Sequence, residues 1–197
     1  MKCIILSHVY TQKNDRKTLE LVEFALKHWG EHNPESFIMA IGHGVKPRNL
    51  KNCCNYFIWP SEIVGNKMHH AQNNLLYQGL EVAEKKGFRN VLKSRSDTIH
   101  FRKNIFDFAK SILQSDNKLL VSEKTKTDQQ ELCDSFLYGS TSRMKKIYKV
   151  KNPNLDLQFV SVSKLKCINL DAHWEHLKNE KHAMLSFNLN NESEYYL

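Results

Sequence analysis

Glycine is scarce in this sequence, with seven glycines among 197 residues. The chain contains neither a Gly-x-Gly-x-x-Gly motif nor a Gly-x-x-x-x-Gly-Lys-Ser/Thr motif, so a glycine-rich phosphate loop is disfavoured. A phosphate group would therefore meet side chains or a helix N-terminus.

Other catalytic and structural signatures are also missing. No Gly-x-Ser-x-Gly is present, which argues against a hydrolase-type serine nucleophile, and no His-Glu-x-x-His is present. The five cysteines include no Cys-x-x-Cys pair, and we expect them to be reduced and structural. His173 and His176 would offer at most two ligands from one helical turn, so surface or hydrogen-bonded histidine is favoured over zinc.

Long apolar runs are absent as well. No stretch approaches the ~20 residues of a membrane span. The apolar start Met1–Leu6 is too short for a secretory signal, and we expect a cytoplasmic protein.

Charge is the composition's main bias, with a formal net charge of +8. Such a balance favours anionic partners, namely nucleic acid, nucleotide or an anionic membrane surface. The basic residues are scattered in pairs such as Lys85-Lys86 and Lys145-Lys146, and no nucleic-acid-binding motif is present.

Apolar runs alternate with helical patterns, which predicts one α/β domain with a mostly parallel central sheet flanked by helices. Strands are expected at Lys2–Ser7, Phe37–Ile41, Tyr56–Trp59, Phe88–Lys93, Lys118–Ser122 and Phe159–Val162. Helices are expected from Asn14 or Asp15 to Trp29, and over 66–87, 104–113 and 171–186, with another beginning at Ser140 or Thr141. The polar segment Glu123–Glu131 is expected to be a loop near a site.

The segment after the fourth expected strand carries a carboxylate between cations. If the extended backbone persists, Lys93, Arg95 and Asp97 share one face. Ligands of α/β sheets bind outside the carboxyl ends of the strands. The segment therefore suits a phosphate or diphosphate, with or without a divalent ion, or else forms an intramolecular ion pair.

Two further polar side chains occupy unusual positions. Gln72 falls inside the apolar stripe of its helix and needs a partner, either a backbone edge or a ligand. Asp134 precedes an apolar strand-like run, where it either faces the same crevice as Asp97 or caps a turn.

The order of these motifs resembles the WavE-type lipopolysaccharide-synthesis proteins, which look like small A-type (GT-A) glycosyltransferases. The matching stretch is Met68–Tyr148, and it carries Gln72-Asn73, Lys93-Ser94-Arg95-Ser96-Asp97 and Asp134-Ser135-Phe136-Leu137-Tyr138-Gly139. The resemblance implies a single Rossmann-like GT-A domain over 1–197, with a nucleotide-sugar core at 1–148 and a C-terminal acceptor or accessory region at 149–197.

The resemblance also implies roles for individual residues. Asp97 would bind Mg²⁺ or Mn²⁺ bridging the donor diphosphate. Arg95 stands where the family's first acidic residue is expected, so Arg95 could instead neutralise the diphosphate directly. The expected donor-binding residues are Lys93, Arg95, Asp97, Gln72 and Asn73. Asp134 would be the catalytic base of an inverting transfer.

The resulting prediction is a glycosyltransferase of surface polysaccharide (lipopolysaccharide or capsule) biosynthesis. It would move a sugar from a nucleotide-sugar donor to a glycan or lipid-linked acceptor, with peripheral membrane association and no nucleic-acid partner. Two alternatives stay open: a non-catalytic nucleotide or sugar-phosphate binding protein on the same fold, and a basic nucleic-acid-binding protein.

Overall fold

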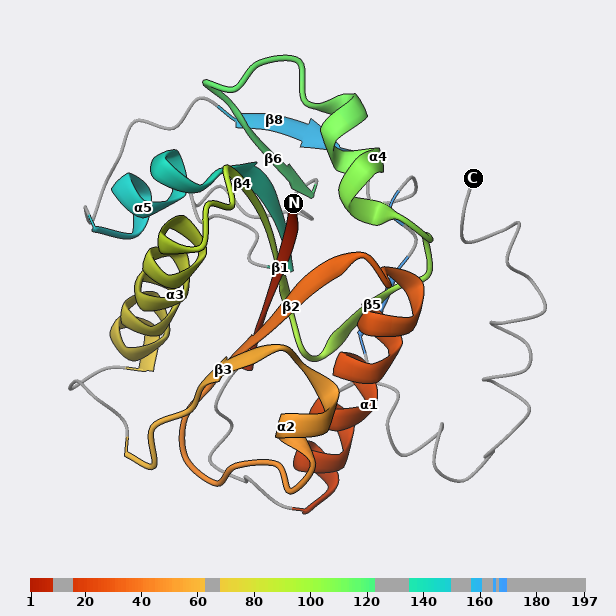
Figure 1. The fold of residues 1–197 in the computed structure, drawn as a ribbon, viewed down its shortest axis with the longest axis vertical. Coiled ribbons are helices and arrows are strands. Elements are labelled where there is room, and N and C mark those ends of the chain that lie inside the picture. Colours follow the sequence, from red (N-terminus) through yellow and green to blue (C-terminus); the bar gives the residue numbers. More distant parts are fainter. Residues whose placement is uncertain are drawn as a thin grey trace.

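Strands and helices alternate along the chain of the computed structural model (Figure 1). The described residues are 1–8, 16–62, 68–122, 135–149, 157–160, 165 and 167–169. The strands are β1 (Lys2–Ser7), β2 (Ser36–Ile41), β3 (Tyr56–Ile58), β4 (Asn90–Arg95), β5 (Thr98–His100), β6 (Leu119–Ser122), β7 (Phe136–Ser140), β8 (Leu157–Val160) and β9 (Cys167–Asn169). The helices are α1 (Arg16–His32), α2 (Leu50–Cys53), α3 (Met68–Lys85), α4 (Ile105–Ile112) and α5 (Thr141–Lys149).

The main sheet has the strand order β3-β2-β1-β4-β7-β6-β8. The pairs β1–β2, β1–β4, β2–β3 and β6–β8 are parallel, whereas β7 is antiparallel to both of its neighbours. A separate two-stranded ribbon joins β5 to β9. The predicted fold class, an α/β domain with a mostly parallel sheet flanked by helices, is therefore confirmed.

Each face of the sheet has its own apolar core. Helices α3 and α5 cover one face, and α1, α2 and α4 cover the other (Figure 1). Side chains alternate between faces along a strand. Accordingly Ile5 packs with the α3 cluster, and its neighbours Ile4 and Leu6 pack with the α1 cluster.

Strand order creates a switch point in the middle of the sheet. From β1 the chain moves outward through β2 and β3, and it then crosses back to place β4 on the other side of β1. In such sheets, ligands bind at the carboxyl ends of the strands beside this point. Ser7 at the end of β1 is in register with both Ile41 and Arg95, so these three strands end on one line.

Several boundaries differ from the sequence prediction, and two of the differences have a visible cause. Helix α1 continues past Gly30 to His32, and its end is closed by Asn33, whose side-chain amide donates to the Trp29 carbonyl at 3.0 Å. Strand β4 begins at Asn90 rather than Phe88, because Phe88 closes α3: its N–H donates to the Ala83 carbonyl at 3.0 Å. Gly87 allows this closure with a φ of 81°.

Segments beyond residue 148 pair with strands of the first 148 residues. Strand β8 extends the main sheet beside β6, and β9 pairs with β5. The division at 148/149 stays a prediction, and the expected loop Glu123–Glu131 and helix 171–186 lie outside the described residues. Within the described residues, no helix has both the length and the apolar character that a membrane crossing requires.

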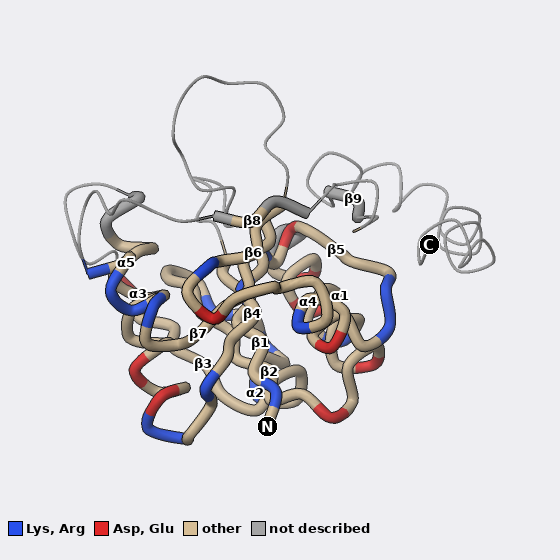
Figure 2. The backbone as a smooth tube through the Cα atoms, turned by 90° about the horizontal axis from the view of Figure 1, so that it is seen from above, with Lys and Arg blue, Asp and Glu red and all other residues tan. Residues whose placement is uncertain are grey.

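Basic and acidic residues are interspersed around the described part of the chain (Figure 2). Ion pairs connect different elements or their ends among the described residues, such as Lys2 with Glu35 and with Asp107, and Lys145 with Glu84. Some of the lysines behind the basic net charge are thus matched locally by carboxylates.

Candidate functional site

The carboxyl edge of the sheet is held together by backbone hydrogen bonds that continue past the ends of the strands. The His8 N–H donates to the Ile41 carbonyl at 2.8 Å, and the Gly42 N–H donates to Ile58 at 3.0 Å. On the other side, the Ser96 N–H donates to the Ser7 carbonyl at 2.9 Å. The residues that follow β1, β2 and β4 are therefore fixed relative to one another.

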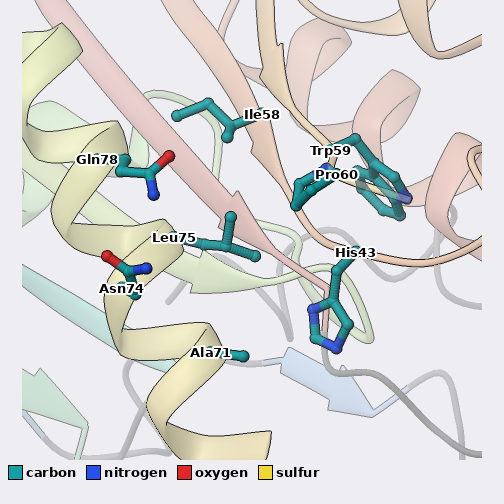
Figure 3. Close-up of a pocket in the computed structure, with 8 residues that line it drawn as sticks. All are labelled: His43, Ile58, Trp59, Pro60, Ala71, Asn74, Leu75 and Gln78. Carbon is teal, nitrogen blue, oxygen red and sulfur yellow. The ribbon is translucent and has the colours of Figure 1, made fainter. Parts of the chain in front are cut away.

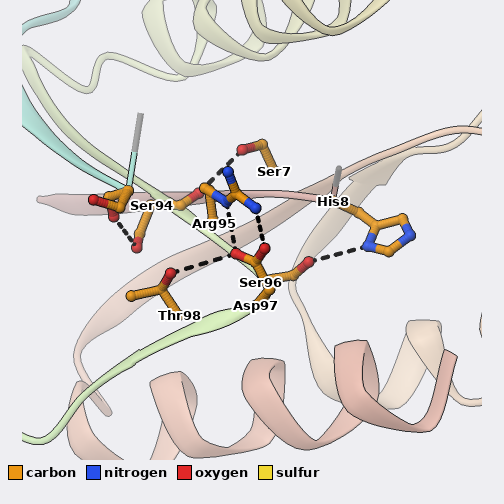
Figure 4. Close-up of polar contacts among 8 residues, drawn as sticks. Ser7, His8, Ser94, Arg95, Ser96, Asp97 and Thr98 are labelled. Atoms are coloured by element: carbon orange, nitrogen blue, oxygen red, sulfur yellow. Dashed lines mark hydrogen bonds and ion pairs between the residues drawn. The ribbon is translucent and has the colours of Figure 1, made fainter. Parts of the chain in front are cut away.

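The turn after β4 carries an ion pair (Figure 4). The guanidinium of Arg95 donates from Nε to Asp97 Oδ1 at 2.7 Å and from Nη2 to Asp97 Oδ2. Thr98 Oγ1 donates to Asp97 Oδ1 at 3.3 Å. The Asp97 side chain is 7% exposed and that of Arg95 26%, so Arg95 is the more accessible partner at the edge.

The backbone after Arg95 differs from the extended conformation that was considered from the sequence for Lys93 to Asp97. Strand β4 ends at Arg95, and Ser96 and Asp97 form a turn into β5. Asp97 thus meets Arg95 by folding back, not by strand alternation. The intramolecular ion pair expected from one interpretation is present; the diphosphate role of these residues stays a prediction.

Lys93 lies two residues before the edge and is 2% exposed. It is paired with Ile5 on one side and Leu137 on the other, on the face that α3 covers. Burial of an ammonium group is costly, so a lysine at this depth indicates a specific polar environment. The buried position of Lys93 does not test the prediction that it contacts a nucleotide-sugar donor.

A cavity of about 380 Å³ lies between the ends of β2 and β3 and the helix α3 (Figure 3). Its volume is at the lower end of the ~300–1,000 Å³ typical of ligand pockets. It is lined by His43, Ile58, Trp59, Pro60, Ala71, Asn74, Leu75 and Gln78. This lining is mostly apolar and contains no acidic, lysine or arginine side chain.

The loop residues of this pocket are tightly positioned. A Cβ atom on Gly42 would lie 2.5 Å from the Trp59 ring, so glycine is needed for the indole to pack there. The Trp59 Nε1–H donates to the Val45 carbonyl at 3.2 Å. His43 is 1% exposed, and burial lowers the pKa of its imidazole, which favours the neutral ring.

The polar residues of α3 are divided between the pocket and its surroundings. Asn74 and Gln78 line the pocket, and neither was singled out from sequence. Their spacing from Ala71 and Leu75 follows the i, i+3, i+4, i+7 pattern of a single helix face, a signal that could have identified them. Gln72 is partly buried, and its Nε2 has no hydrogen-bond partner among the described residues, whereas Asn73 is exposed.

His8 connects the pocket to the turn after β4, and sequence reasoning also missed it. Its Nδ1 lies 3.1 Å from Ser96 Oγ (Figure 4), and its ring stacks on Trp59 with centroids 5.5 Å apart. The only sequence signal that could have identified His8 is its position directly after the first expected strand. Asp134, the predicted catalytic base, lies outside the described residues.

The described residues leave the predicted divalent cation untested. They contain no cluster of three or more His, Cys, Asp or Glu side chains that could hold a metal. Both Asp97 oxygens accept from the Arg95 guanidinium, so the carboxylate already has a cationic partner. The predicted Mg²⁺ or Mn²⁺ stays a prediction, to which the described residues lend no support.

Comparison with solved structures shows the fold. A cytidylyltransferase from Leptospira borgpetersenii serovar Hardjo-bovis is similar with a TM-score of 0.61 at 10% identity, over 99% of this chain and 96% of that one. A glycosyltransferase involved in glycosylation of the major capsid of PBCV-1 has a TM-score of 0.48 at 17% identity, over 90% and 89% of the chains. A protein assigned as a nucleotide-diphospho-sugar transferase, from Desulfovibrio desulfuricans G20, has a TM-score of 0.49 at 10% identity, over 99% of each chain.

Comparison of the sequence alone identifies no relative. No family model and no curated protein matches the chain. The WavE-type resemblance therefore stays a prediction, and the comparison with the cytidylyltransferase supports the α/β fold alone.

Proposed function

We propose that the protein is a glycosyltransferase that takes a sugar from a nucleoside-diphosphate donor. The observation that carries the proposal is the pairing of two unlike features on one sheet edge. An uncharged pocket lies at the ends of β2 and β3, and an accessible arginine lies at the end of β4. A nucleoside diphosphate has the same division into a neutral ring system and an anionic group.

The pocket supports the nucleoside half of this assignment. Its apolar walls suit a flat ring, and the amides of Asn74 and Gln78 lie one helical turn apart on α3, facing the cavity (Figure 3). An amide offers both donors and an acceptor, which matches the polar edge of a nucleobase.

Arg95 supports the diphosphate half. A guanidinium presents a planar set of donors that suits phosphate oxygens, and it stays charged at every physiological pH. As the bond to the anomeric carbon breaks, negative charge grows on the leaving diphosphate, and a cation held at the site stabilises that charge. Lys93, Asp97, Gln72 and Asn73 complete the proposed donor-binding set.

The transfer itself also needs a base near the acceptor hydroxyl. Asp134 remains our candidate for this role in an inverting reaction, and a glycan or lipid-linked acceptor at a membrane surface remains the proposed acceptor. The finer assignments, to the WavE type and to lipopolysaccharide or capsule assembly, belong to this proposal and rest on sequence resemblance.

A thermal-shift panel of UDP, GDP, CDP and their sugar conjugates, with Mn²⁺ and with EDTA, tests the donor. A ligand at a hundredfold its Kd stabilises the fold by about 2.7 kcal/mol. We expect one nucleotide family to raise the melting temperature, and the shift to persist in EDTA if Arg95 alone holds the diphosphate. Loss of the shift in EDTA would instead support the predicted metal.

Two variants locate the ligand. Gln78→Leu should weaken nucleoside binding and leave inorganic pyrophosphate binding unchanged. Asp134→Asn should abolish sugar transfer and leave donor binding intact. A chain that binds no nucleoside diphosphate under any of these conditions would contradict the proposal, as would one that binds only nucleoside triphosphates.

A further inference from the structure

His8 occupies a central place on the carboxyl edge. It is the first residue after β1, it is 5% exposed, and its N–H is held by the Ile41 carbonyl. Since β1 lies between β2 and β4, His8 stands between the pocket side and the turn side of this edge.

Each part of the His8 ring contacts a different half of the proposed site. The ring lies nearly parallel to the indole of Trp59, at an interplanar angle of 17°, and Trp59 is a wall of the pocket. Its Nδ1 is within hydrogen-bond distance of Ser96 Oγ, in the turn that carries Asp97 (Figure 4). His8 is thus a direct link between the pocket wall and the turn.

Spacing matters for a ligand whose two halves are covalently linked. Once one half is bound, the other binds as if at a high local concentration, provided that the two subsites stand at the correct distance. A residue that fixes this distance affects the linked ligand strongly and each separate half weakly.

We infer that His8 is a positioning residue that sets the spacing between the nucleoside pocket and the diphosphate-binding turn. This inference rests on the proposed function. His8 acts here through Trp59 and Ser96 and needs no contact with the donor.

The test compares a linked ligand with its parts, using the full chain. The dissociation constants of UDP, uridine and inorganic pyrophosphate are measured by calorimetry or ligand-observed NMR, or those of GDP, guanosine and pyrophosphate if GDP gives the larger thermal shift. The product of the two fragment constants divided by that of the linked ligand is the linkage factor. We expect His8→Ala to lower this factor about tenfold or more, because small displacements of a subsite carry large costs, while the fragment constants stay near wild type.

Two conservative variants separate the contacts of His8. His8→Phe keeps a ring beside Trp59 and loses the hydrogen bond to Ser96; His8→Asn keeps a polar group near Ser96 and loses the stacking. Each should retain part of the linkage factor and should fold even if His8→Ala does not. His28→Asn is the matched control, because His28 is also buried but lies on α1 and packs against Phe101. This variant should lower stability without changing the factor.

The outcomes distinguish the two claims. A wild-type chain that binds neither UDP nor GDP contradicts the proposed function. A wild-type chain that binds one of them, together with His8 variants that keep the full linkage factor or weaken the fragments as much as the linked ligand, overturns the role of His8 alone.

Discussion

The two halves of the carboxyl edge are built from different interactions. The pocket half, at the ends of β2 and β3, is fixed by shape: Trp59 fits against Gly42, and no acidic, lysine or arginine side chain lines the cavity. The turn half, at the ends of β1 and β4, is fixed by polar contacts: Arg95 pairs with Asp97, and Ser96 meets His8. One sheet edge therefore offers a neutral surface and a charged one within the same fold.

This difference shows why one edge can take a ligand of mixed character. Apolar walls contribute affinity without strict direction, whereas a guanidinium fork sets orientation and charge. Perturbations that act on charge should affect the turn half, and perturbations of shape should affect the pocket half.

A drop in pH should have the largest effect, on the stability of the fold. It should act through two buried histidines, His28 and His100, beside β5. His28 Nε2 lies 3.3 Å from the carbonyl of His100, the last residue of β5. Burial, followed by the proximity of His32, lowers the pKa of His28 to about 3, and burial lowers that of His100 to about 4. Both rings are therefore neutral in the fold at pH values where the unfolded chain, with pKa values near 6.5, already takes up protons.

The sign follows from this difference. The stability that the two neutral histidines contribute is fully present above pH ~6.5. It falls as the pH drops toward 4, because the unfolded state binds more protons. Each histidine should lower the free energy of unfolding by about 1–2 kcal/mol at pH 5. Urea unfolding at pH 7.5 and pH 5 measures the loss, and His28→Asn should reduce it. An unfolding free energy equal at both pH values would show that these rings do not contribute.

Removal of the Arg95 charge should have the next largest effect. Hydrogen bonds to charged groups contribute about 1.5–3 kcal/mol, so Arg95→Ala should weaken pyrophosphate binding roughly ten- to hundredfold. Nucleoside binding should be unchanged in the folded fraction, even though the mostly buried Asp97 loses its partner. Calorimetric titration measures both.

Lys145→Ala is the control for charge alone, because Lys145 pairs with Glu84 between α5 and α3. If it weakens pyrophosphate binding as much as Arg95→Ala does, the effect is one of net charge and the turn half has no special role. Arg95→Lys should give an intermediate affinity, since it keeps the charge without the fork.

A change of shape should act on the pocket half with the smallest effect. Gly42→Ala places a Cβ 2.5 Å from Trp59, and such overpacking costs about 1–3 kcal/mol. Gly30→Ala is the matched control, because a Cβ there meets nothing within 4 Å and the residue lies inside α1. It should stabilise the protein by roughly 0.5–1 kcal/mol. Thermal unfolding measures both, and equal melting temperatures for the two variants would contradict the packing role of Gly42.

Much of the fold was predictable because its signals are local. Apolar runs gave β1, β2 and β3 within about a residue, and the helical periodicity with Gly87 gave the end of α3. The ribbon of β5 and β9 was not predictable, because its strands are three residues long and pair across a wide sequence separation. No local pattern encodes such a pairing.

The site divides in the same way. Arg95 and Asp97 could be singled out because a carboxylate between cations is visible in a short segment, although the turn that joins them was not expected. His8, Trp59 and Gln78 were missed because their importance depends on which strands and helix lie side by side. That information comes from strand order, which a single sequence states only weakly.

The central position of β1 has a consequence for biosynthesis. Its partner β4 follows 88 residues later, as the pairing of Ser7 with Arg95 shows. At 5–20 residues per second, a ribosome needs roughly 4 to 18 s to supply that partner. During this interval the aliphatic run Cys3–Leu6, fully buried in the finished sheet, lacks one of its two neighbouring strands. Nascent chains of this protein should therefore depend on chaperones until the fourth strand emerges.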